Sequence, residues 1–240
     1  MSETAIIIGI DFGTTVGSPR FIRNKRPLAL TPSLAQQYSG VSWALTSSKR
    51  VNVINDWRTL YGSVGNQDKV PSSITYTANG RVNNWGYLVD DVKEDPFQWI
   101  KIMLDPSHKY FNDTQQSRQV SARLERLGKT PEDVVADYLK CLWDYTIAHI
   151  KRKKGDDFQF VYTVKVVLTV PAVWSALAKD KTLKAAKKAG IRTEIKLVTE
   201  PEAAALALLK DKCEETSIKV RVIASSYLFL SPESRGLREI

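Results

Sequence analysis

Short apolar runs separated by polar turns occupy the first half of the chain, a pattern typical of β-strands. The pattern predicts strands over 5–11, 38–46, 51–57 and 73–76. Asn79-Gly80 follows the last of these segments and is typical of a hairpin turn. The apolar segment 97–104 predicts a helix. The first half is therefore predicted to be rich in strands.

The second half alternates between helix and strand signals. Thr130 can cap a helix, because Pro131 follows at its first position and two acids complement its first turn. Its apolar face recurs at helical spacing and comprises Val135, Leu139, Leu142, Trp143, Ile147 and Ile150, before Gly155 ends the helix. The pattern then predicts a strand over 164–170, a helix from Ser175 to Ala189, a strand over 195–199 and a helix over 202–210. This alternation predicts an α/β fold.

The chain is basic, with a formal net charge of +9, which raises the possibility of a nucleic-acid partner. The location of the charge argues against it. Residues 16–37 hold +4 with three prolines, and residues 220–240 hold +1, so that the rest of the chain carries the remaining +4. Residues 151–154 form a basic run that reads either as the solvated last turn of a helix or as a nucleic-acid contact.

Several other classes of protein are disfavoured. Cys141 and Cys213 are far apart in the sequence and read as reduced thiols rather than as a disulfide framework. A zinc site is disfavoured, since the chain has two histidines and no CxxC motif. The first residues lack the features of a signal peptide, and no apolar run approaches the length of a membrane span. The expected location is the cytoplasm, with the nucleus as an alternative.

The segment from Ile8 to Thr15, IGIDFGTT, carries the strongest chemical signal. Gly13 allows the backbone to turn sharply, and the Thr14 and Thr15 hydroxyls can then donate to phosphate oxygens. Asp11 ends the strand and can hold a hydrated Mg²⁺ through water. The segment is not a Walker P-loop, because GxxxxGK[ST] is absent. An ordinary strand followed by an acidic turn is the alternative interpretation.

Three further segments occur downstream of this one. They are VPS at 70–72, KVVLTVPAV at 165–173 and LVTEPEAAAL at 197–206. In this order, the four segments resemble the nucleotide-binding domain of the seventy-kilodalton heat-shock family, an actin-like ATPase family. The tryptophans in YSGVSWAL and PFQWIKIML are closer to its divergent members. The resemblance implies a ribonuclease-H-like first lobe with a mixed sheet and flanking helices over 1–218, with a smaller subdomain near 50–125.

The resemblance also implies roles for particular residues. Asp11 matches the acid that positions water and the metal, Thr14 and Thr15 match the phosphate-contacting pair, and Gly13 belongs to the same motif. Glu200 matches the acid that acts near Mg²⁺ and the attacking water. The implied ligands are ATP or ADP with Mg²⁺, and the implied reaction is phosphoryl transfer to water.

The lysine of the family that contacts the γ-phosphate corresponds to Lys101. An exposed helix lysine is the alternative interpretation of Lys101. For Glu200, the alternative is a partner of the helix N-terminus ahead of Pro201.

Two departures from the family pattern stand out. Residues 16–37 separate the GTT motif from the next strand, and their removal would restore the family pattern. The family's DxGGGT motif and adenosine-binding lobe do not follow, and 219–240 reads as an atypical tail. We therefore expect an incomplete lobe. Both segments can be translated introns. The codons of Val16 and Val220 begin with GT, and the codon of Gln37 can be CAG, which match the common first and last bases of an intron. A genuine loop in a naturally truncated protein is the alternative.

Four functions follow in decreasing order of support. The first is an ATP-binding, chaperone-like ATPase lobe, weakly active or inactive as written. The second is a non-catalytic scaffold or regulatory protein. A sugar or metabolite kinase of the same superfamily and a nucleic-acid-binding protein come third and fourth. The expected partners are nucleotide and, through the family, client proteins or co-chaperones, with no membrane partner.

Overall fold

The computed structural model describes residues 4–16, 37–48, 50–62, 64–105 and 115–215. The predicted insertion, except for its two end residues, and the predicted tail therefore lie outside the described residues. Six strands of the described part form the main sheet: β1 (Ala5–Val16), β2 (Gln37–Leu45), β3 (Val51–Val53), β6 (Lys69–Pro71), β9 (Thr163–Val170) and β10 (Glu194–Thr199). The predicted strands at 5–11, 38–46, 164–170 and 195–199 are thereby confirmed.

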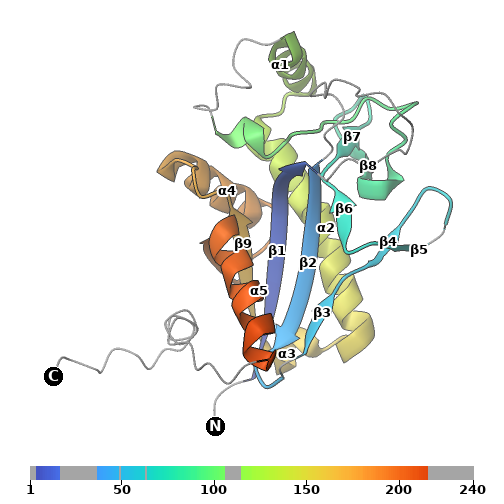
Figure 1. Ribbon diagram of the computed structural model, residues 1–240. Coiled ribbons are helices and arrows are strands. Elements are labelled where there is room, and N and C mark those ends of the chain that lie inside the picture. Colours follow the sequence, from blue (N-terminus) through green and yellow to red (C-terminus); the bar gives the residue numbers. More distant parts are fainter. Residues whose placement is uncertain (1–3, 17–36, 49, 63, 106–114, 216–240) are drawn as a thin grey trace, which may run out of the picture.

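The main sheet is mixed, with strand order β10-β9-β1-β2-β3 and β6 beside β2 (Figure 1). β1 runs parallel to β9 and antiparallel to β2, and β9 runs parallel to β10. Along β1, every second side chain points into the core, so that Ile6, Ile8, Ile10 and Phe12 are buried. The mixed α/β architecture predicted from the sequence is confirmed.

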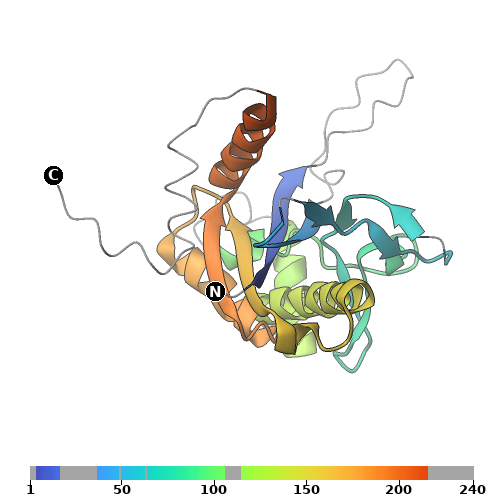
Figure 2. The same cartoon turned by 90° about the horizontal axis from the view of Figure 1, so that it is seen from below.

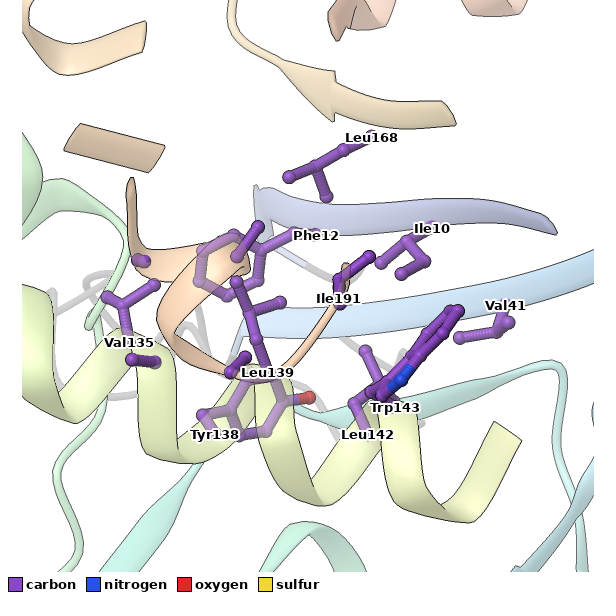
Figure 3. Close-up of a cluster of buried hydrophobic side chains, with 14 of the residues drawn as sticks. Ile10, Phe12, Val41, Val135, Tyr138, Leu139, Leu142, Trp143, Leu168 and Ile191 are labelled. Atoms are coloured by element: carbon purple, nitrogen blue, oxygen red, sulfur yellow. The ribbon is translucent and has the colours of Figure 1, made fainter. Parts of the chain in front are cut away.

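Helices cover both faces of this sheet. α2 (Pro131–Lys154) and α4 (Ala176–Lys188) lie on one face, while α5 (Glu200–Glu215) lies on the other (Figure 2). The short helix α3 (Phe158–Val161) leads into β9. α2 packs on the buried side chains of β1 and β2, and Figure 3 shows this contact between Phe12, Val41 and the helix residues Tyr138, Leu139, Leu142 and Trp143.

The helix ends follow the predicted capping chemistry. The Thr130 hydroxyl accepts a hydrogen bond from the Asp133 amide, and the Asp133 carboxylate accepts from the Thr130 amide, which forms a capping box. Ser175 caps α4 in the same way, by accepting from the Ala178 amide at 3.2 Å. Gly155 ends α2 with φ at 94°, a left-handed value that favours glycine.

Shorter elements lie beyond the main sheet. They are β4 (Asp56–Arg58), β5 (Val64–Asn66), β7 (Ile74–Tyr76), β8 (Val82–Trp85), the 3-10 turns η2 (Gly86–Leu88) and η3 (Ile102–Leu104), and α1 (Gln115–Leu127). The strand predicted over 51–57 is split, because β3 pairs with β2 whereas β4 pairs with β5. The division of the chain into 1–218, with a smaller subdomain near 50–125, stays a prediction.

The helix predicted over 97–104 is wrong. Phe97 instead exchanges both backbone hydrogen bonds with Ile74, and Trp99 has a positive φ of 60°, which is incompatible with an α-helix. Only the 3-10 turn η3 forms in this described segment. The backbone between Phe97 and η3 therefore turns back toward the end of the main sheet.

Asp133 gives the fold a predictable dependence on pH. Its carboxylate accepts from the Thr130 amide at 2.8 Å and pairs with the Lys188 ammonium. Burial alone would raise the pKa of Asp133, but the interactions with Lys188 and Thr130 outweigh it and lower the pKa to about 2. Because an unfolded aspartate titrates near a pKa of about 3.9, ionised Asp133 stabilises the fold above that pH. This stabilisation is lost as the pH falls toward 2.

We expect Asp133→Asn to lower the free energy of unfolding at neutral pH by about 2 kcal/mol. The difference from the unmodified chain should persist at about pH 5, shrink at about pH 3 and vanish near pH 2. Urea unfolding followed by circular dichroism at these pH values measures it. Asp144→Asn is the control, since Asp144 pairs with Lys140 in an exposed position and should cost less than about 0.5 kcal/mol. A pH-independent difference for Asp133→Asn would contradict the assignment.

Candidate functional site

The candidate residues gather where three parallel strands end. Asp11 directly follows the last residue of β1 that pairs with β9, Thr169 lies near the end of β9, and Glu200 directly follows β10. Parallel neighbours end at the same edge of a sheet, which in open α/β sheets is the edge where ligands bind. In Figure 1 this edge lies toward the upper end of β1, on the side of the sheet nearest α1. The fold thus brings together residues that are far apart in the sequence.

Lys101 lies at the centre of this edge. Its side chain is 0% exposed, and its ammonium donates to the Glu200 carboxylate Oε1 at 2.8 Å and to the Phe12 carbonyl oxygen. The same ammonium lies over the rings of Phe12 and Trp174, at 5.4 and 5.5 Å from their centroids. The alternative interpretation of Lys101 as an exposed helix lysine is therefore wrong.

Burial governs the electrostatics of Lys101. Removal from water lowers the pKa of Lys101, because the charged ammonium loses its hydration. The hydrogen bond and charge of Glu200 oppose this effect, as does the charge of Asp11. A buried ammonium costs several kcal/mol unless it is paired. The fold thus holds a desolvated cation in place with an acid and a backbone carbonyl.

The local chain explains how Lys101 reaches this position. Its neighbour Ile100 is fully buried, and Leu104 in η3 is fully buried as well. These two anchors fix the turn that begins after the positive φ of Trp99. A lysine within a regular exposed helix would not be aimed at the end of β1.

Asp11 has a different set of partners. Its Oδ1 accepts from the Thr169 hydroxyl at 2.9 Å, and its Oδ2 pairs with the Lys69 ammonium at 2.9 Å. The Asp11 side chain is 38% exposed and that of Lys69 is 48% exposed. Thr169 and Lys69 are site residues that the sequence reasoning missed. Both lie within or beside the recognised segments, since Thr169 belongs to VLTVP and Lys69 directly precedes VPS.

The backbone of the Gly13-Thr14-Thr15 segment departs from regular pairing. β1 and β2 pair regularly up to Phe12 opposite Ser39, and the register then shifts before Val16 pairs with Gln37. Such a bulge carries unpaired backbone groups at the end of a strand. The side chains of Thr14 and Thr15 lie outside the described residues, so their phosphate-contacting role stays a prediction.

Glu200 begins α5, and its alternative role at the helix N-terminus can be compared with the geometry. The Thr199 amide donates to the Glu202 carboxylate at 2.9 Å, so that Thr199 and Glu202 supply the side-chain cap of this end. The Glu200 carboxylate is directed to Lys101 instead. The capping acid Glu202 and the candidate-site acid Glu200 are thus two residues apart at the start of α5.

The donor set fits a divalent metal poorly in this arrangement. Asp11 and Glu200 each pair with a lysine, and Asp11 also accepts from Thr169. Across the ranges that the structure describes, no group of three or more histidine, cysteine, aspartate or glutamate side chains could hold a metal ion. The role of Asp11 and Glu200 around a hydrated Mg²⁺ stays a prediction from the resemblance.

The mixed sheet, the helices on both faces and the bulge in β1 form a mixed α/β lobe, consistent with the actin-like ATPase type that the resemblance implies. Three curated proteins among those that match the chain illustrate the similarity. The heat shock 70 kDa protein 12A of Mus musculus is 24% identical over 217 residues, which is 84% of this chain and 28% of the relative. The human protein of the same name is 23% identical over 217 residues, with the same shares. The chaperone protein dnaK of Thalassiosira pseudonana is 27% identical over 226 residues, 89% of this chain and 31% of the relative.

The chain is therefore similar to heat shock 70 kDa proteins over most of its length, at the level of a divergent, Hsp70-like relative. No family model matches the chain. The chain spans less than a third of the length of the curated relatives it matches. In the described part of the chain, no helix has both the length and the apolar character needed to cross a membrane.

Proposed function

We propose that the chain is an ATP-binding lobe of a chaperone-like ATPase of the heat shock protein 70 type. The observation that carries the proposal is Lys101, a fully buried ammonium held by Glu200 and by the Phe12 carbonyl where the strands end. A desolvated cation has a strong interaction with an anion that reaches it, because little water screens the charge. Nucleotide phosphates are the anions that the family resemblance indicates.

The proposed roles follow from these positions. Lys101 would donate to the terminal phosphate of ATP, and its interaction would strengthen as negative charge develops during phosphoryl transfer. Glu200 would hold Lys101 and orient the attacking water, because its carboxylate is 28% exposed and so reaches both. Asp11 would hold a second water through its exposed carboxylate. Gly13, Thr14 and Thr15 would contact the other phosphates.

Mg²⁺ is the metal that the family resemblance implies, and when bound it would neutralise phosphate charge. Asp11 and Glu200 are each paired with a lysine, so the roles proposed for these side chains do not depend on the metal. Hydrolysis, client proteins, co-chaperones and a cytoplasmic or nuclear location are proposed for the whole protein. A non-catalytic scaffold remains the second proposal, since the two acids of the site are already neutralised within the chain.

Calorimetric titration of the full 240-residue chain with ATP and ADP tests the proposal. We expect saturable binding, which Lys101→Met weakens at least tenfold, about 1.4 kcal/mol. Lys140→Met is the matched control, because Lys140 pairs with Asp144 on the exposed face of α2, and it should bind like the unmodified chain. Absence of heat with both nucleotides, or equal binding by Lys101→Met, would contradict the proposal. Single-turnover hydrolysis of bound ATP then separates the ATPase from the scaffold.

A further inference from the structure

A second lysine, Lys69, also reaches the site, and it comes from β6. Lys69 belongs to β6, whereas its partner Asp11 belongs to β1, and β2 lies between these two strands. Neighbouring strands lie about 5 Å apart, so the backbones of β6 and β1 are about 10 Å apart, and the side chains of Lys69 and Asp11 together bridge β2. The ion pair joins residues that lie 58 positions apart in the sequence. Such a contact depends on the register of three strands.

The register provides a direct path for this side chain. Asp11 pairs with Gly40 of β2, and Gly40 pairs with Lys69, so the three residues form one row across the sheet. Directly opposed residues of antiparallel strands point to the same face. A Cβ on Gly40 would lie 3.4 Å from Cγ and 3.8 Å from Cε of Lys69. These are ordinary contact distances, so the lysine side chain lies directly against β2 at Gly40 on its way to Asp11.

Lys69 is also anchored at its backbone and coupled to the rest of the site. Its carbonyl oxygen accepts from the Tyr87 hydroxyl at 2.9 Å, which ties β6 to η2. Burial lowers the pKa of Lys101, and the positive charge of Lys69 lowers it further, so the two ammoniums act within one electrostatic site. The edge of the sheet thus carries two acids and two ammoniums, Asp11 with Lys69 and Glu200 with Lys101.

We propose that Lys69 is a built-in counter-ion of Asp11 that takes the place of a divalent metal, so that the site binds the diphosphate group of a nucleotide without one. An ammonium has three N–H donors. Lys69 can therefore keep its bond to Asp11 and still donate to a phosphate oxygen. A divalent ion at Asp11 would have to displace this ammonium or lie beside it against like charge. The inference rests on the proposed function for the nucleotide, but its anion chemistry can be tested separately.

The first experiment uses pyrophosphate as the probe, in excess EDTA, with the full 240-residue chain. Calorimetry should show saturable binding by the unmodified chain and equal binding by the control Lys140→Met. Lys69→Met should weaken binding about tenfold, because one of two ammoniums is lost, whereas Lys69→Arg keeps the charge and should stay within about threefold. Equal pyrophosphate binding by Lys69→Met, or no binding by the unmodified chain, would overturn the proposal.

The second experiment compares ADP binding in excess Mg²⁺ and in excess EDTA. The unmodified chain should bind ADP with affinities within about threefold of each other in the two conditions, whereas Lys69→Met should require the metal by about tenfold. A tenfold metal requirement in the unmodified chain would overturn the proposal. If pyrophosphate binds and ADP does not, the proposed nucleotide function fails while the role of Lys69 stands. If ADP binds and Lys69→Met changes neither titration, the role of Lys69 fails while the nucleotide function stands.

Discussion

Glu200→Ala should lower the free energy of unfolding by about 3 kcal/mol at neutral pH, because it leaves the Lys101 ammonium buried without its acid. Lys101 is 0% exposed, and loss of the Glu200 carboxylate leaves its ammonium with the uncharged Phe12 carbonyl as its remaining hydrogen-bond partner among those described above. The deficit should shrink as the pH rises toward 10, since a neutral amine costs less to bury than an ammonium. Urea unfolding followed by circular dichroism at several pH values measures both effects.

The paired variants separate the loss of the ion pair from the loss of a side chain. Lys101→Met removes the buried charge and conserves volume, so it should cost less than about 1.5 kcal/mol. Adding Glu200→Ala to Lys101→Met should then cost little more, which gives a coupling of at least about 1.5 kcal/mol. Asp180→Ala is the control, because its pair with Lys184 is exposed and should contribute less than about 0.5 kcal/mol. Additive changes in the free energy of unfolding for Lys101→Met and Glu200→Ala would show that the ion pair does not contribute to stability.

Phe12→Ala should lower the free energy of unfolding by about 3–5 kcal/mol. The Phe12 side chain is 0% exposed and stacks on the Tyr138 ring at 5.8 Å between centroids. Figure 3 shows it between β1 and α2, close to Val135 and Leu139. The same ring lies beneath the Lys101 ammonium, so its removal also takes away one wall of the site. We therefore expect this variant to lose nucleotide binding together with stability.

Phe160→Ala provides a matched control for this substitution. Phe160 is 92% exposed in α3, so the same truncation should change the free energy of unfolding by less than about 0.5 kcal/mol. Both variants are measured by urea unfolding under identical conditions. A cost for Phe12→Ala that is no larger than the cost for Phe160→Ala would show that the contact between β1 and α2 is misplaced.

Much of the fold could be predicted from the sequence because its signals are local. The short apolar run at the start of the chain predicts β1, and Thr130, Pro131 and Gly155 predict the ends of α2. The helix predicted over 97–104 was wrong for a non-local reason, since Phe97 exchanges its backbone hydrogen bonds with Ile74. A window of sequence cannot show that a segment's backbone groups are satisfied by a distant strand.

The candidate site likewise has residues that the sequence could identify and residues that it could not. The resemblance identified Lys101 and Glu200 as members of one site, and the structure places their side chains in contact at 2.8 Å. Lys69 could not be predicted, because its contact with Asp11 depends on the register of β1, β2 and β6. Gly40 read as an ordinary strand residue, although the Lys69 side chain lies against it between β6 and β1. Register is a tertiary property that no short motif encodes.

Hydrogen–deuterium exchange of the full chain with and without saturating ADP tests most directly whether nucleotide phosphates bind where the parallel strands end. We expect slower exchange in peptides that cover 8–16, 97–105, 166–175 and 196–204, and no change at the far end of α2 around 150–156. Lys101→Met should abolish the protection at the same ADP concentration. Protection confined to other parts of the chain, or protection that Lys101→Met leaves intact, would contradict the account.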